Sequence, residues 1–263
     1  MITVQSPIPT HKGASVMLIT VLLILAATRP TAADTILMGA SFSIPPYVIR
    51  ETDQGIEPDI LRESFERRGH KVKMEYLPLA RTFGHLKSGL IDGAINVTEG
   101  LLEDVFYSDV VILFQNCAIS LAKRNYPPFD SVAFLADKHV IAFQRASTIL
   151  GPAFGEMASN NSRYEETAVQ KTQLFRLFLE RDADFIIIEQ RIFAYYRKEA
   201  RRRLGAVADQ PVRLDCIFPS TAYRFAFRSR TLRDDFNAGL QAIRAEGVYD
   251  RIMERYAQVG AQP

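Results

Sequence analysis

Hydrophobic and polar residues along positions 35–98 alternate in a way that predicts strands and helices in regular succession. Residues 35–39 and 91–97 are short apolar runs, as expected of strands covered on both faces. Residues 71–76 alternate polar and apolar side chains, as in a half-buried strand. Residues 55–69 and 78–89 carry apolar side chains at helical spacing, and each segment ends at a glycine. This βαβαβ order predicts a sheet flanked by helices.

The pattern changes over residues 104–121, which form a long extended apolar run. Such a run is typical of a chain that passes from one sheet to another, so we place a boundary within residues 116–123. The succession of strands and helices then resumes. Strands are predicted at 139–143, 184–188 and 223–227, and helices at 149–158, 170–181, 191–203, 231–246 and 248–256.

Polar side chains surround the predicted strand at residues 91–97. Arg81 lies at the start of the preceding helix, and Asn96 and Thr98 lie at the carboxyl end of the strand. Ligands of open α/β sheets bind just beyond such strand ends. These residues therefore either line one edge of a binding cleft or belong to an ordinary αβ unit with a solvated Arg81.

Four other positions are candidate binding residues, and each has an alternative. Tyr47 follows two prolines whose backbone is fixed, so its ring either stacks on a ligand or closes the core. Ser147 or Thr148 caps the next helix, whose free N–H groups either hold an anion or only complete the turn. Glu189 ends an apolar strand and must face solvent, a partner or a ligand.

The N-terminal residues are typical of a secretory signal peptide. The apolar run at residues 14–27 is too short to span a bilayer comfortably, and it follows Lys12. The small residues at 31–33 suit cleavage by signal peptidase, so residues 1–33 are predicted to be removed. A retained anchor or a later start at Met17 is the alternative.

Composition and charge narrow the possible partners. The 263-residue chain is long enough for one large α/β domain or two small lobes. Its formal net charge of +2 is matched by Lys12 and Arg29, which lie in the predicted signal peptide. The remaining chain is then neutral, and no overall field draws it toward nucleic acid.

The two cysteines, Cys117 and Cys216, either form a disulfide in an oxidising compartment or remain as two buried thiols. The histidines lack metal-ligand spacing with cysteine or glutamate. The sequence contains no phosphate loop, dinucleotide fingerprint or nucleophile elbow. Neither a metal nor a cofactor is therefore expected.

Several short motifs follow one another in an order that is more specific than any of them alone. They are Pro45-Pro46-Tyr47, Gly55-Ile56-Glu57-Pro58-Asp59, Leu86-Lys87-Ser88-Gly89 with Asp92, Asn96-Val97-Thr98-Glu99 with Phe106-Tyr107-Ser108, and the segments 144–148, 184–189 and 232–256. In this order the chain resembles the family 3 periplasmic solute-binding proteins. That family serves ATP-driven uptake of polar amino acids and related solutes.

The resemblance implies a two-lobed α/β fold of the type II periplasmic binding proteins, joined by two crossing strands. Lobe 1 would comprise residues 34–116 and 222–263, and lobe 2 residues 117–221. Solute would bind between the lobes, which close by hinge motion.

The resemblance also assigns roles to residues of this sequence. Tyr47 would stack on the solute, Asn96 and Thr98 would bind it from lobe 1, the turn from Ala146 to Thr148 would hold it from lobe 2, and Glu189 would bind its ammonium group.

One position departs from the family pattern. Amino-acid binders of this family usually carry an arginine two residues after the Thr-Glu pair, where it clamps the α-carboxylate. This chain has Leu101 there. Leucine cannot replace a charge-assisted bidentate contact. Either Arg81 supplies the cation or the solute carries no carboxylate.

The expected function is capture of a small polar solute in the periplasm by a monomeric, non-catalytic protein, for an ABC transporter permease of the inner membrane. Two alternatives come from the same resemblance. Cyclohexadienyl dehydratases share the fold and use an acid of lobe 2, for which Glu189 would be the counterpart. A solute sensor that docks on a membrane receptor would also have this sequence pattern.

Overall fold

The computed structural model describes residues 1–5, 35–41, 43–179, 181 and 183–258. The chain divides into two units, Met1–Asp34 and Thr35–Pro263. Residues 6–33 of the predicted signal peptide lie outside the described residues. The second unit carries two sheets with their helices.

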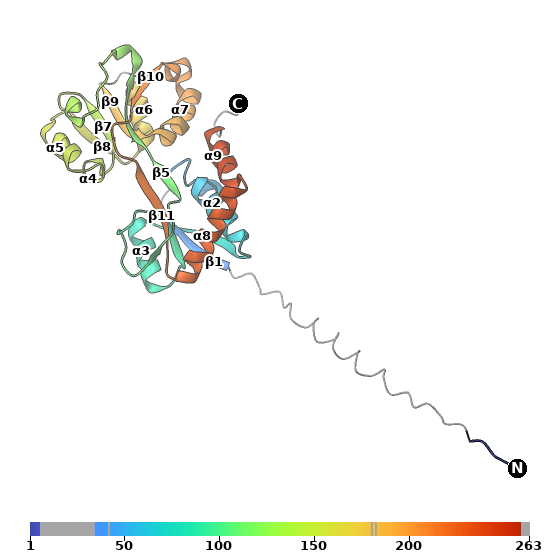
Figure 1. The fold of residues 1–263 in the computed structure, drawn as a ribbon. Helices are drawn as coiled ribbons and strands as arrows, with labels where there is room; N and C mark the ends of the chain where they lie inside the picture. The colour runs from blue at the N-terminus through green and yellow to red at the C-terminus, as the bar shows by residue number, and fades with distance from the viewer. Residues whose placement is uncertain (6–34, 42, 180, 182, 259–263) are drawn as a thin grey trace. The chain divides into compact units, whose positions relative to one another are not determined.

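The first sheet is built from both ends of this unit (Figure 1). Its strand order is β2-β1-β3-β11-β4, and β5 pairs with β11. The strands are β1 (Thr35–Ala40), β2 (Lys71–Tyr76), β3 (Gly93–Val97), β4 (Phe106–Tyr107), β5 (Ile112–Phe114) and β11 (Thr221–Phe227). β1 runs parallel to β2 and β3, whereas β11 runs antiparallel to its neighbours. The helices of this part are α2 (Ile56–Glu66), α3 (Leu79–Ser88), α8 (Arg230–Ala245) and α9 (Val248–Gln258).

The second sheet has the strand order β10-β6-β9-β7-β8. Its strands are β6 (Asn116–Leu121), β7 (Val140–Phe143), β8 (Tyr164–Thr167), β9 (Phe185–Glu189) and β10 (Val212–Asp215). The helices of this part are α4 (Ala146–Ile149), α5 (Pro152–Asn160), α6 (Gln170–Phe178) and α7 (Gln190–Leu204). β7 lies parallel to β8 and β9, and β6 is antiparallel to β9 and β10.

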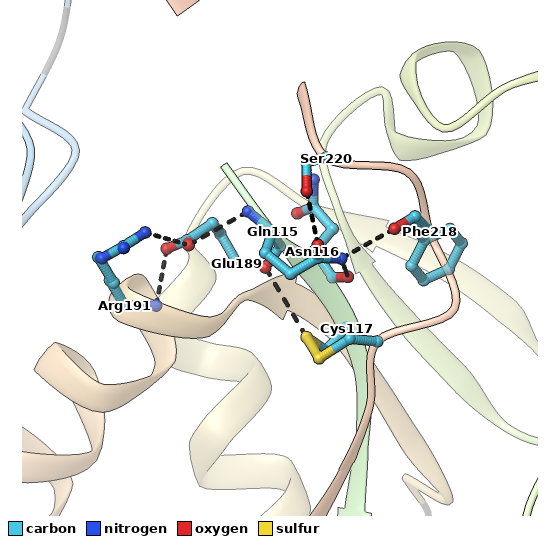
Figure 2. The surroundings of a disulfide bond; sticks show 8 residues. Gln115, Asn116, Cys117, Glu189, Arg191, Phe218 and Ser220 are labelled. Atoms are coloured by element: carbon cyan, nitrogen blue, oxygen red, sulfur yellow. Dashed lines mark hydrogen bonds and ion pairs between the residues drawn. A yellow bond between two sulfur atoms is a disulfide. The ribbon is translucent and has the colours of Figure 1, made fainter. Parts of the chain in front are cut away.

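Two segments connect the sheets, and they are joined to each other (Figure 2). The first runs from β5 through Gln115 into β6, and the second runs from β10 to β11. Cys117 and Cys216 form a disulfide between them. The side-chain amide of Gln115 donates to the Phe218 carbonyl at 2.8 Å, and the Ser220 hydroxyl donates to the Gln115 side-chain oxygen at 2.7 Å. The two connections are therefore braced as one strip.

The glycine of the Gly55-Ile56-Glu57-Pro58-Asp59 motif is required by the backbone. Gly55 has φ 137°, and an added Cβ would lie 2.3 Å from the Tyr47 carbonyl oxygen. Its N–H donates to the Tyr256 hydroxyl at 2.8 Å, and that hydroxyl donates to Asp59 at 2.7 Å. The motif thus fixes the start of α2 against both the loop that carries Tyr47 and α9.

The predicted and observed elements agree closely in the first sheet and less well in the second. The apolar run at 104–121 forms three strands, β4 to β6, of which only β6 belongs to the second sheet. The helix predicted at 149–158 is two helices, because Gly151 has φ 95° and interrupts the α-helical backbone before Pro152. β8 and β10 lack a predicted counterpart.

The core consists of apolar side chains between sheets and helices. Phe65 of α2, Phe225 and Phe227 of β11, and Phe236 of α8 are fully buried and in ring contact. Phe154, Phe185 and Leu135 belong to a second cluster under the other sheet. Within the described part of the chain, no helix has the length and apolar character needed to cross a membrane.

Candidate functional site

A cleft of about 600 Å³ is lined by residues from both sheet regions. Its lining is Ser41, Ser43, Ile44, Leu79, Asn96, Thr98, Leu101, Arg145, Ile149, Gln170, Thr221 and Tyr223. These residues follow β1, end or follow β3, follow β7, end α4, or start α3, α6 and β11. The cleft therefore lies beyond the carboxyl ends of parallel strands, as in other open α/β sheets.

Asn96 and Thr98 place polar groups of the first sheet in this cleft. Asn96 has φ 58°, a left-handed conformation that asparagine tolerates better than most residues. Near it lies the fully buried carboxyl of Glu57, which has no hydrogen-bond partner at either oxygen by distance and angle among the described residues. Burial raises the pKa of Glu57 to about 8, and the nearby Asn96 side chain acts in the opposite direction.

The N–H groups of the turn at the start of α4 bind a carboxylate of the protein itself, that of Glu166. The Glu166 carboxylate accepts from the backbone N–H of Arg145 at 2.6 Å and from that of Ser147 at 2.9 Å. It also accepts from the hydroxyls of Ser147 and Tyr164. Burial opposes ionisation of Glu166, but these donors outweigh it and lower its pKa. The N–H groups of this turn, which the sequence leaves as either an anion site or part of the turn alone, are thus bonded to Glu166.

Arg145 begins the same turn and lines the cleft. Its backbone is left-handed, with φ 67° and ψ 18°. Among the residues that line the cleft, it carries the one side chain with a formal charge. Its guanidinium makes no hydrogen bond or ion pair with any residue that the structure describes.

Glu189 lies at the carboxyl end of β9, as predicted, but its carboxylate is turned to the protein (Figure 2). It caps α7 by accepting from the N–H groups of Arg191 at 2.7 Å and Ile192 at 3.0 Å. Its other oxygen lies 3.6 Å from the Arg191 guanidinium. Only 2% of Glu189 is exposed. Burial raises its pKa, although the two N–H donors and the guanidinium act against that effect.

Tyr47 is fully buried, and its ring stacks on Phe114 with 3.9 Å between the centroids. Its hydroxyl lies 3.4 Å from a guanidinium nitrogen of Arg191, which donates to it. Burial, with the nearby Glu189 charge, raises the pKa of Tyr47 far above its usual range. In the structure the Tyr47 ring is therefore packed in the core, and Tyr47 does not line the cleft.

The predicted site residues therefore separate into three groups. Asn96 and Thr98 line the cleft, together with Leu101. Arg81 is exposed in the first turn of α3 and Thr148 is exposed in α4, and neither lines the cleft. Tyr47 and Glu189 are buried and Ser147 is half-buried, and none of the three lines the cleft.

Several lining residues were not predicted from the sequence. Arg145 stands within the turn that the sequence singled out, but only the small residues of that turn were chosen as ligands. Ser41, Ser43, Gln170, Thr221 and Tyr223 complete the polar lining. The positions directly after β1 could have been found from the same strand-end rule.

Residues 36–259 match the bacterial extracellular solute-binding proteins, family 3. The chain belongs to this family. A comparison with curated proteins gave no match. Membership in an extracellular solute-binding family assigns a solute-binding function and a location outside the cytoplasm.

Solved structures share the fold at low sequence identity. A histidine kinase sensor domain with similarity to periplasmic binding proteins is 18% identical, with a TM-score of 0.63 over 85% of this chain and 96% of its own. The GluR0 ligand-binding core in complex with L-glutamate is 16% identical, with a TM-score of 0.66 over 86% and 99%. The substrate-binding protein AbpA of Streptococcus pneumoniae, bound to L-arginine, is 14% identical, with a TM-score of 0.62 over 87% and 97%. The fold is the two-lobed α/β fold of type II periplasmic binding proteins.

Proposed function

We propose that this solute-binding protein captures a small polar solute in the cleft and delivers it to the permease of an ABC transporter in the inner membrane. The observation that carries the proposal is the cleft itself, whose polar lining comes from both sheet regions of a family 3 fold. A pocket of this size with a few fixed polar groups suits a small molecule. The substrate-binding proteins among the structural neighbours support the transporter role.

The lobes are proposed to comprise residues 34–116 with 222–263, and residues 117–221. The braced strip at Gln115 and Cys117 would be the hinge. Solute that contacts Asn96 and Thr98 on one side and the turn at Arg145 on the other would favour the closed form, because only that form makes both sets of contacts.

Binding without catalysis is part of the proposal. General acid–base catalysis needs a titratable side chain within reach of the reacting group. Among the described residues that line the cleft, none is a histidine, aspartate, glutamate, lysine or cysteine, and burial raises the pKa of the lining tyrosine, Tyr223, to about 12. The carboxylate of Glu189, which the dehydratase alternative would use, is engaged as the cap of α7.

The cellular setting is proposed from the sequence. Residues 1–33 would serve as the signal peptide, and the protein would act as a monomer in the periplasm, without nucleic acid as a partner. A receptor partner is the alternative, because one structural neighbour is a histidine kinase sensor domain. Cross-linking in membranes would distinguish a permease partner from a receptor partner.

The direct test is a thermal-melt screen of the purified protein against amino acids, organic acids, polyamines and small peptides. A solute at a hundred times its Kd stabilises the folded state by about 2.7 kcal/mol. For a chain of this length the melting temperature then rises by roughly 5 to 10 °C. Small-angle scattering on the hit should show a smaller radius of gyration, as closure requires.

A matched pair of variants locates the site. Thr98→Val removes a hydroxyl from the cleft and should weaken binding of the hit by about tenfold. Thr231→Val makes the same change on the exposed start of α8, outside the cleft lining, and should leave binding unchanged. Equal affinities of all three proteins would place the solute elsewhere.

A further inference from the structure

Among the described residues of its lining, the cleft holds one unpaired cation. Arg145 lines the same cleft as Leu101, the position where amino-acid binders are expected to carry a carboxylate-binding arginine. A guanidinium binds a carboxylate in bidentate fashion, which leucine cannot do. The positive charge that Leu101 lacks on the first-sheet side of the cleft is thus present at Arg145, on the side of the second sheet.

No other side chain of the described lining carries a positive charge. The N–H groups of the turn at Arg145 and Ser147 are already bonded to Glu166. Arg81, the alternative from the sequence, is exposed and does not line the cleft. An anionic solute therefore has the Arg145 guanidinium as its charged partner.

The backbone at Arg145 is held in a conformation that arginine disfavours. Its φ of 67° lies in the left-handed region, which glycine adopts without penalty. The bonds to Glu166 keep the turn in this form. Disfavoured conformations of this kind concentrate at functional sites, where the surrounding structure maintains them.

The described lining has no negatively charged side chain that could pair with an ammonium group. It contains no aspartate or glutamate, and Glu189 is 2% exposed and occupied by the N–H groups of α7. An ammonium group that entered the cleft would lose water without gaining an opposite charge, which is costly. The charge pattern therefore favours an acid over an amino acid.

Apolar contact is available beside the cation. Leu79, Leu101 and Ile149 line the cleft and are 42%, 52% and 49% exposed. Exposed apolar side chains gathered in a groove are typical of ligand-binding surfaces. They would be covered by an apolar portion of the solute or by closure over it.

We propose that Arg145 is the carboxylate-binding residue of this cleft, and that the solute is a small carboxylic acid with an apolar group and without an amine. The inference rests on the proposed solute-binding function and narrows its substrate class.

Two sets of matched compounds test the substrate class by isothermal titration calorimetry on the purified protein. One set is 3-phenylpropanoate, L-phenylalanine and 3-phenylpropanamide. The other is 4-methylpentanoate, L-leucine and 4-methylpentanamide. In each set the first compound has the carboxylate alone, the second adds an amine, and the third has no charge. In at least one set the acid should bind at least tenfold more tightly than the other two.

Variants of the same protein test the residue. Arg145→Gln should weaken binding of the acid ten- to hundredfold, as expected for loss of a hydrogen bond to a charged group. Arg145→Lys should restore part of the affinity. Arg145→Gly should raise the melting temperature of the free protein, since it relieves the left-handed backbone, yet bind the acid as weakly as Arg145→Gln. Arg202→Gln removes an exposed arginine of α7 and should bind like the wild type.

Each of the other outcomes refutes a specific part of the proposal. A preference for the amino acids, or a hit of another class in the solute screen, refutes the substrate class and leaves the solute-binding function intact. Loss of binding in Arg81→Gln with none in Arg145→Gln refutes the assignment of the cation. Failure of every compound in both experiments refutes the inference and the proposed function together.

Discussion

Glu57 gives a sharp test of the structure, because a fully buried carboxyl without a hydrogen-bond partner among the described residues must affect stability in a pH-dependent way. Its pKa is raised from 4.5 to about 8, first by burial, with Asn96 acting against that effect. The amino end of α2 favours the anion by about 0.3–1 kcal/mol, which is small beside the cost of burial. At pH 7 the folded protein therefore holds Glu57 protonated, whereas the unfolded chain ionises it.

The sign and size of the effect follow from this difference. Below pH 4.5 the group is protonated in both states and costs nothing. As the pH rises from about 4.5 to 8, the unfolded state releases its proton first, so stability is lost at about 1.4 kcal/mol per pH unit. At pH 7 the loss is about 3 kcal/mol, and above pH 8 it levels off at about 5 kcal/mol.

The assay is urea denaturation of the wild type and Glu57→Gln at intervals from pH 5 to 8. Glutamine has nearly the same shape and does not titrate. The free energy of unfolding of the variant, minus that of the wild type, should grow by about 3.5 kcal/mol over this range. Glu66→Gln removes an exposed carboxyl from the same helix, and its curve should follow the wild type. If the Glu57→Gln and wild-type curves are parallel, the carboxyl is not buried as the structure shows it.

Four further substitutions test the packing and capping of the helices. Glu189→Ala removes the cap of α7 and should lower the free energy of unfolding by about 1–2 kcal/mol in urea denaturation. Gly239→Ala would place a Cβ 1.9 Å from a backbone oxygen of α2 and should cost about 1–3 kcal/mol by the same assay, whereas Gly84→Ala meets open space in α3 and should stabilise by about 0.5–1 kcal/mol. Tyr256→Phe removes the hydroxyl that bridges the amide and carboxylate at the start of α2, and should cost about 1–3 kcal/mol in a thermal melt.

A variant that is as stable as the wild type would contradict the contact that it was designed to remove or disturb. An unchanged stability of Glu189→Ala would mean that its carboxylate faces the cleft rather than α7. A neutral Gly239→Ala would contradict the close approach of α8 to α2. A Tyr256→Phe variant as stable as the wild type would show that the motif at Gly55 does not depend on α9.

The elements of the first sheet could be predicted because each has a strong pattern. β2 alternates in polarity, and α3 is capped at its carboxyl end by Gly89, whose φ is 79°. β8 and β10 could not be predicted, since both are edge strands of the second sheet and carry charged residues at half-buried positions. Their pairing depends on neighbours distant in sequence, which a local pattern does not contain.

The site was predictable where its residues end a buried strand, as with Asn96 and Thr98. The site was not predictable where side chains of the protein occupy the hydrogen-bonding groups that a ligand would otherwise bind. Glu166 occupies the turn N–H groups from a strand 19 to 21 residues away. Glu189 has the position expected of a ligand residue, yet its own helix provides its partners. Sequence position identifies which groups are near the cleft, and only the contacts show which of them are free.

The bridge between Cys117 and Cys216 makes the second sheet a covalently closed insertion within the first. Four of the five strands of the second sheet lie between the two cysteines in the chain, and the fifth, β6, contains Cys117. Once the bridge forms, the covalent path between the two halves of the first sheet is a few residues long instead of about a hundred. Bringing the two halves together then costs only the loop-closure entropy of a short loop. A single proteolytic cut within residues 118–215 would then release no fragment until the protein is reduced. The second sheet could thus be nicked or lengthened while the first remains one continuous molecule.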